Sequence, residues 1–265
     1  MTTKIIRVPG RFEKALGYAN HIPLPALPSG LVRFNLFGVS LGYSAVNRAS
    51  GDAIPDPVLV SDITGIGTLS YEDTYGHSNN RTAGWGDPTL ALNYTDGYSV
   101  LAVSSVASGS TSAAFTTQDF SSTDGTGERL NRGPSLASFR AQRRDASVSI
   151  LPAATVTFGS STTGPVAAFG VLDVPDDEVR CLAPHHSGTS TAQSLSDAVG
   201  WEPSGSPGAG WARAYVSAGS AENDVVEDVR MYCAGVWDRP LSDGEMMTAY
   251  AAIKPWLARM GVDIA

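Results

Sequence analysis

The sequence predicts an all-β domain, a sandwich or barrel of antiparallel strands with one helix at its C-terminal end. Short segments of period-two apolar patterning recur along the chain, and clusters of Gly, Pro, Ser or Asp separate most of them. Charged residues make up only 17% of the 265 residues, and small, turn-forming residues are abundant, which suits many short strands with tight connections. The regular alternation of strands with amphipathic helices that marks an α/β fold does not occur in the pattern.

The first strand shows the pattern clearly. Val32, Phe34 and Leu36 alternate with the polar Arg33 and Asn35, which is the period-two arrangement of a half-buried strand. The same kind of pattern predicts further strands at residues 98–106, 146–150, 155–158, 166–174, 179–182, 211–216 and 225–232.

The first 28 residues differ from the rest of the chain. They contain Pro9, Pro23, Pro25 and Pro28, and proline excludes both a long helix and a central strand. We therefore expect residues 1–28 to form an irregular N-terminal arm and residues 29–265 to form the sandwich.

The C-terminal helix is expected over residues 242–260. Ser242 and Glu245 have the spacing of a capping box, and Leu241 before the cap is placed to pack on Met246. One apolar stripe is expected to cover the sheet, and it consists of Met246, Tyr250, Ile253, Leu257 and Met260.

Two residues are expected to affect the geometry of the last turns of this helix. Pro255 removes an internal hydrogen bond, so we expect a kink or a restart near Lys254. Gly261 is suited to end the helix.

The charge of the chain argues against nucleic acid as a partner. The formal net charge is -8 and the pI is about 4.9, and no stripe of Lys and Arg interleaved with aromatic residues occurs. The densest basic run, Arg140, Arg143 and Arg144, adjoins Asp145 and is interpreted as a solvated strand edge rather than an anion site. No run of 18 apolar residues occurs, so no membrane span is expected.

Cysteine and histidine do not form a metal-binding pattern. Cys181 and Cys233 are each isolated in the sequence, and the first residues are too short and too polar for a signal-peptide core. We therefore expect a chain made in a cytoplasm with two free, buried thiols, although a single bridge between them is the alternative. His185 and His186 are expected in a loop, and no metal or other cofactor is expected; calcium is not indicated.

One stretch resembles a known family. The segment VVEDVRMYCAGVWDRPLSDGE, residues 225–245, is similar to the terminal signature of laminin G-like members of the concanavalin A-like lectin/glucanase superfamily. In that signature a strand of the form I-D-x-V-R-I-Y precedes D/N-R-x-L-S-x-x-E-I. The matching residues are Val226, Asp228, Val229, Arg230, Met231, Tyr232, Asp238, Arg239, Leu241, Ser242 and Glu245.

The match has two departures, and it covers about a tenth of the chain. Residues 233–237 are extra residues between strand and helix, and Met246 replaces the usual Ile. The resemblance implies a two-sheet antiparallel jelly-roll sandwich with a C-terminal capping helix, and it does not imply a particular ligand.

Glycoside hydrolases of the same superfamily carry E-x-D-x-x-E on a strand. Here Glu222, Asp224 and Glu227 have that spacing, which implies a nucleophile, a tuning neighbour and an acid/base in that order. On a regular strand, however, Glu227 lies on the opposite face from Glu222, and Asn223 replaces an apolar residue. The alternative is that these acids form the turn and start of the last strand.

A loop is expected at residues 71–88, which have no clean period, and another at residues 184–210. Aromatic rings stack on sugars and polar groups meet sugar hydroxyls, and the first loop contains both kinds of group. The candidate ligand-binding residues are Tyr71, Asp73, Tyr75, His77, Asn79, Asn80, Arg81, Trp85 and Asp87. Two alternatives stay open: Trp85 and Tyr71 either stack on a ligand or anchor the loop to its own sandwich.

A second pair of aromatic residues, Trp201 and Trp211, lies on either side of another predicted turn. These two residues are expected to brace a hairpin.

Taken together, these patterns predict a binding protein rather than an enzyme. Laminin G-like modules occur in virus particles, so the resemblance suggests a bacteriophage virion protein of the tail, fibre or capsid surface that attaches to host-surface glycans. The N-terminal arm is then expected to dock on other virion proteins, and a homo-oligomer is expected, with a trimer suited to a fibre. The alternatives are the glycoside hydrolase and a structural virion module without a ligand.

Overall fold

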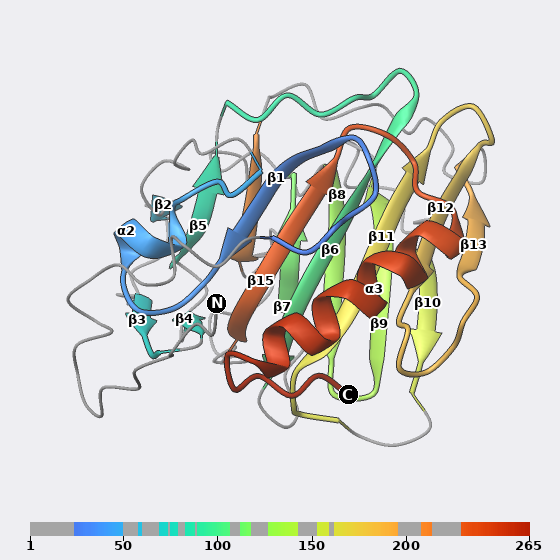
Figure 1. The fold of residues 1–265 in the computed structure, drawn as a ribbon. Coiled ribbons are helices and arrows are strands. Elements are labelled where there is room, and N and C mark those ends of the chain that lie inside the picture. The colour runs from blue at the N-terminus through green and yellow to red at the C-terminus, as the bar shows by residue number, and fades with distance from the viewer. Residues whose placement is uncertain are drawn as a thin grey trace, which may run out of the picture.

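A computed structural model describes residues 24–49, 58–59, 69–73, 75–78, 83–87, 89–106, 112–117, 127–142, 153–158, 162–195, 208–213 and 229–265. Over these residues the chain is mostly β, with two antiparallel sheets and one long C-terminal helix (Figure 1). This confirms the predicted fold class. Among the same residues, no helix is long and apolar enough to cross a lipid bilayer.

One sheet lies under the C-terminal helix, and we name it the helix-side sheet (Figure 1). Its strands lie in the order β13-β12-β11-β6-β15-β4-β3, and β1 pairs with β15 beside this path. The bounds are β1 Leu31–Leu36, β3 Leu69–Tyr71, β4 Gly76–Ser78, β6 Gly97–Val106, β11 Val166–Asp173, β12 Glu178–Leu182, β13 Thr191–Ser194 and β15 Val229–Trp237.

The other sheet, named the back sheet, has the order β10-β9-β8-β7-β14-β5-β2. The bounds are β2 Val58–Leu59, β5 Ala83–Asp87, β7 Ser112–Thr116, β8 Gly127–Gly133, β9 Leu136–Gln142, β10 Ala153–Thr157 and β14 Ala209–Arg213. In both sheets many strands that lie side by side are distant in the sequence. In the back sheet, for example, β14 lies between β5 and β7.

Most of the predicted strands are present. Those at 31–36, 98–106, 155–158, 166–174, 179–182, 211–216 and 225–232 correspond to β1, β6, β10, β11, β12, β14 and β15, whereas residues 146–150, 214–216 and 225–228 lie outside the described part of the chain. Residues 233–237 are not an insertion between strand and helix, because they form the second half of β15, against which β1 pairs. Strands β7, β8 and β9 were not predicted from the sequence.

Both stretches predicted to be loops contain strands. β4 and β5 lie within 71–88, and β13 lies within 184–210. These strands have three to five residues and are rich in Gly, Ser and Thr, so they are too short and too poor in aliphatic residues to show a period.

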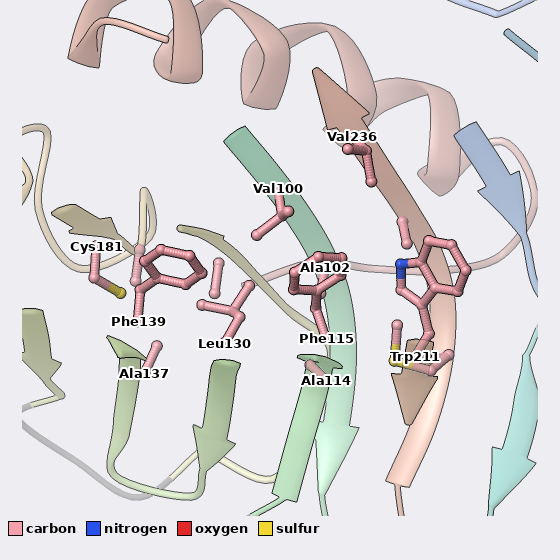
Figure 2. Close-up of a cluster of buried hydrophobic side chains, with 14 of the residues drawn as sticks. Val100, Ala102, Ala114, Phe115, Leu130, Ala137, Phe139, Cys181, Trp211 and Val236 are labelled. Atoms are coloured by element: carbon pink, nitrogen blue, oxygen red, sulfur yellow. The ribbon is translucent and has the colours of Figure 1, made fainter. Parts of the chain in front are cut away.

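The core lies between the two sheets. Figure 2 shows Val100 and Ala102 of β6 and Val236 of β15 facing Phe115, Leu130 and Phe139 of the back sheet, and all of these side chains are buried. Gly170 on β11 leaves room for the Phe139 ring, because a Cβ atom there would overlap the Cδ2 atom of that ring. The bulky ring and the missing side chain therefore fit together across the sandwich.

The other face of the helix-side sheet is covered by the helix α3, Asp243–Ala258 (Figure 1). The predicted capping box is present, with Ser242 accepting from the Glu245 N–H and the Glu245 side chain accepting from the Ser242 N–H. The predicted stripe packs on that face, since Met246, Ile253 and Leu257 are fully buried and Tyr250 and Met260 are partly buried.

The predicted restart of the helix near Lys254 is wrong. One helix runs from residue 243 through Pro255 to residue 258, and the Pro255 side chain is exposed. Proline has no N–H to donate within the helix, and a kink at this position stays a prediction. Gly261 ends the helix as predicted, with φ +85° and with the Val262 N–H donating to the Leu257 carbonyl at 3.1 Å.

The polar side of β1 is buried, which differs from the half-buried strand predicted there. Asn35 has no exposed surface and donates to the carbonyl oxygens of Ser44 and Val46 at 3.1 and 3.0 Å. Arg33 is 7% exposed and pairs with Asp87 of β5 in the back sheet. Both faces of this strand are therefore covered, and its polar residues bond to the covering elements.

The last residues of the predicted N-terminal arm pack on the sandwich. Leu24 and Leu27 contact the apolar cluster under α3, and the Trp237 indole N–H donates to the Pro28 carbonyl at 3.1 Å. Residues 1–23 lie outside the described part of the chain.

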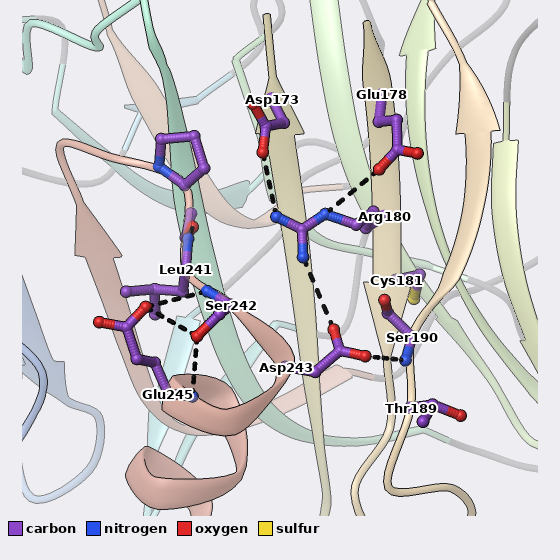
Figure 3. Close-up of polar contacts among 12 residues, drawn as sticks. Asp173, Glu178, Arg180, Cys181, Thr189, Ser190, Leu241, Ser242, Asp243 and Glu245 are labelled. Atoms are coloured by element: carbon purple, nitrogen blue, oxygen red, sulfur yellow. Dashed lines mark hydrogen bonds and ion pairs between the residues drawn. The ribbon is translucent and has the colours of Figure 1, made fainter. Parts of the chain in front are cut away.

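Two arginines fix the start of α3. Figure 3 shows Arg180 of β12 between Asp173 and Asp243, with N–O distances of 3.2 and 3.6 Å. Arg239 pairs with Glu245 at 2.5 Å and donates to the Ser29 carbonyl at 3.1 Å. The D-R-x-L-S stretch of the family signature therefore has a structural role, because it holds the helix start against the first described residues and the sheet.

Candidate functional site

The predicted ligand-binding residues lie on the β3–β4 hairpin and on β5. Tyr71 ends β3, Asp73 lies in the turn, and Tyr75 precedes β4. Tyr71 packs on the cluster between the sheets and Tyr75 packs on the cluster on the helix side. The two rings are therefore on opposite faces of the hairpin and do not form one platform.

Trp85 lies inside the sandwich. It has no exposed surface, its ring centroid lies 4.8 Å from that of Phe37, and its indole N–H donates to the Tyr71 hydroxyl at 3.2 Å. Gly76 makes room for the indole, because a Cβ atom there would lie 2.5 Å from Trp85 Cζ2. Of the two alternatives left open by the sequence, the geometry fits the anchor, and burial raises the pKa of the Tyr71 hydroxyl.

Asp87 is also an interior residue. Its carboxylate has no exposed surface, pairs with Arg33, and accepts from the Thr89 N–H and hydroxyl at 2.9 and 2.7 Å. The oxygens of this carboxylate are already paired inside the sandwich. The structure therefore places Trp85, predicted to stack on a ligand, and Asp87, predicted to hydrogen-bond to one, in internal contacts.

Tyr75 lies on the helix-side face of the hairpin. Its half-buried ring lies 5.6 Å from the ring of Tyr232, and the guanidinium carbon of Arg230 lies 5.2 Å from its centroid. Arg230 is exposed, whereas Tyr232 is 7% exposed and its hydroxyl is 3.2 Å from the Ser105 hydroxyl. We name Tyr75, Arg230 and Tyr232 the Tyr75 surface.

The remaining predicted residues are described only in part. Asp73 is exposed in the turn after β3. The backbone of His77 lies in β4, and its side chain, like Asn79, Asn80 and Arg81, lies outside the described residues. Ligand binding by these residues stays a prediction.

Arg230 and Tyr232 were not among the residues predicted to bind a ligand. They belong to the V-R-M-Y stretch of the family signature and are two residues apart on β15, so they share a face. That spacing was visible in the sequence, but the pairing of β15 with β4, with Arg230 opposite His77, was not.

The other candidates from the sequence do not form a site in the part of the chain that the structure describes. Glu222, Asp224 and Glu227 lie outside the described part, as does Trp201. Trp211 is a core residue, fully buried and 6.2 Å from the Phe115 ring. His185 and His186 lie in a turn after β12, as expected.

The two cysteines are free and buried in the structure. Cys181 packs between the sheets and Cys233 packs under α3, and β11 and β6 separate their strands. Three strand spacings amount to roughly 14 Å, which exceeds the reach of a disulfide. Within the described ranges, no group of three or more His, Cys, Asp or Glu is arranged to hold a metal ion.

Comparison with known proteins identifies the fold. No family model and no curated protein matches the sequence. The structure is similar to the receptor-binding domain of the botulinum neurotoxin C/D mosaic serotype, with TM-score 0.57 and 9% identity over 84% of this chain and 51% of that chain. The type G receptor-binding domain gives TM-score 0.57 and 10% identity over 85% and 52%. The serotype D ligand-binding domain in complex with N-acetylneuraminic acid gives 0.53 and 8% over 84% and 50%.

This chain thus spans about half the length of each of these neighbours. At such low identity the likeness concerns the fold alone, which is a β-sandwich.

Proposed function

We propose that this chain is a non-enzymatic, lectin-like attachment module that binds host-surface glycans as part of a virion. The fold resembles about half of each of several receptor-binding domains of toxins, and one of these domains is described in complex with an acidic sugar. The observation that supports a site in this chain is the Tyr75 surface, where a half-buried ring lies beside an exposed guanidinium.

The chemistry of this surface suits a sugar. An aromatic ring offers an apolar face to a pyranose, and an arginine offers several N–H donors to hydroxyl or carboxylate oxygens. Asp73 adds an exposed carboxylate on the same hairpin. None of these groups needs to transfer a proton in order to bind, so the surface supports recognition rather than catalysis.

A glycan array tests this proposal with two variants. Tyr75→Ala is expected to weaken binding about fivefold, since one stacking contact is worth about 1 kcal/mol. Tyr250→Ala, which removes another partly buried tyrosine on α3, is expected to retain binding, and thermal midpoints establish that both variants are folded. Binding that survives in Tyr75→Ala contradicts this surface, and a wild-type chain that binds no glycan contradicts the function.

Two further measurements separate the alternatives. Release of reducing sugar from any bound glycan, lost in Glu222→Gln, would identify a glycoside hydrolase. Particles purified from infected cells are expected to contain the chain, and its absence from them contradicts the virion setting.

A further inference from the structure

A buried arginine in the back sheet makes fewer hydrogen bonds than it has donors. Arg132 is on β8, has no exposed surface, and donates through Nη2 to the Thr162 carbonyl at 2.6 Å. Its Nε and Nη1 atoms are buried and make no hydrogen bond in the part of the chain that the structure describes. Burying such donors without partners is costly, and burial lowers the pKa of Arg132 to about 10.

The ring of Phe158, just after β10, brings Arg132 together with two histidines. The guanidinium carbon of Arg132 lies 5.0 Å from the ring centroid, and the imidazoles of His185 and His186 lie 4.6 and 5.9 Å from it. The three basic groups come from β8 and from the turn after β12, so the tertiary structure assembles them. We name these four residues the Phe158 cluster.

Among the described residues, no carboxylate shifts the pKa of His185 or Arg132. Burial lowers the pKa of His185, and so do the positive charges of Arg132, His186 and Lys254. The Nδ1 atom of His185 is also buried without a hydrogen-bond partner in the described residues. In a chain of net charge -8, a group of three basic side chains with no carboxylate beside them in the described ranges runs against the overall composition.

We propose that the Phe158 cluster is an anion-binding site for one oxyanion group, a carboxylate, sulfate or phosphate ester. His186 is exposed and His185 is partly buried, so the cluster meets solvent at this turn, whereas Arg132 has no exposed surface. An oxyanion accepts hydrogen bonds from guanidinium and imidazole N–H groups, and its charge offsets the mutual repulsion of the basic groups. The site is separate from the Tyr75 surface and does not depend on it.

The anion has two possible sources with the same chemistry, an acidic sugar or a free inorganic ion. Titrations with sodium sulfate and with N-acetylneuraminic acid, at constant pH and ionic strength, distinguish them. Stronger binding of the sugar points to a glycan, whereas equal binding points to a simple anion, and both results support the site.

The imidazole resonances in NMR spectra of the whole chain give a direct readout. The chain has four histidines, and His185→Gln and His186→Gln assign the two that matter. The resonances of His185 and His186 are expected to shift and saturate with added anion. In the sulfate titration, those of His77, on β4 in the other half of the sheet, are expected to stay unchanged.

Charge variants test the cluster itself. Arg132→Gln is expected to weaken the binding of the anion at least tenfold. If that variant does not fold, the same test is made with His185→Gln, in which binding is measured from the resonances of His186. Arg259→Gln removes an exposed cation at the end of α3 and is expected to leave binding unchanged. Shifts that rise without saturation, or that weaken equally in Arg259→Gln, would overturn the proposal.

Discussion

The indole N–H of Trp85 donates to the hydroxyl of Tyr71 across 3.2 Å inside the sandwich. This bond joins β5 of the back sheet to β3 of the helix-side sheet. Two residues that the sequence offered as a binding platform therefore help to fasten the two layers together.

Trp85→Ala is expected to lower the free energy of unfolding by about 3–5 kcal/mol, because it leaves a large cavity in the core. Tyr71→Phe removes only the hydroxyl acceptor and is expected to cost about 1 kcal/mol. Urea denaturation followed by tryptophan fluorescence measures both. A Trp85→Ala chain as stable as the wild type would contradict the interior position of this ring.

Gly170→Ala is expected to destabilise the protein by about 1–3 kcal/mol, because the new methyl group meets the Phe139 ring and overpacks the core. Gly164→Ala is the matched control, since nothing lies within 4 Å of a Cβ atom there. That variant is expected to stay within about 0.5 kcal/mol of the wild type. Equal effects of the two changes in thermal unfolding would speak against the fit of Phe139 to Gly170.

The cap of α3 is expected to lose stability in acid. Hydrogen bonds from Arg239, and then from the Ser242 N–H, lower the pKa of Glu245 to about 2, whereas an unfolded glutamate titrates near about 4.3. A carboxyl with a lowered folded pKa contributes stability that is fully present above its unfolded pKa and is lost as the pH falls towards 2.

Glu245→Gln removes that contribution. Because the ion pair is partly exposed, the loss near neutral pH is expected to be at most about 1 kcal/mol. The difference between the two chains should shrink as the pH falls from 5 to 2. A constant difference over this range, measured by urea denaturation at each pH, would show that the charge of Glu245 is not involved.

The cysteines are expected to be unreactive in the folded protein. Burial raises the pKa of the Cys181 thiol to about 12 and raises that of Cys233 further, so neither forms the reactive thiolate at pH 8. Ellman's reagent should therefore detect no thiol in the native chain and both thiols in denaturant without reductant. A denatured chain that shows no thiol would reveal a disulfide.

Local patterns in the sequence were enough to predict the position of several elements. The alternation of Val32, Phe34 and Leu36 located β1, and the capping box at Ser242 and Glu245 located the start of α3. Such features depend on residues close together in the chain, so periodicity and capping chemistry reveal them. The short, glycine-rich β4 and β5 carry no such period and were missed.

By itself, then, the sequence determined that the chain forms many short strands and one amphipathic closing helix. The tertiary structure alone decided that Arg33 and Asn35 are covered. It also decided that Trp85 lies between the sheets while Tyr75 packs on the helix side, and that Arg132 and His185 both lie against Phe158. The physical reason is that strand pairing brings together residues from distant segments, and which face of a strand is buried depends on the neighbour that covers it.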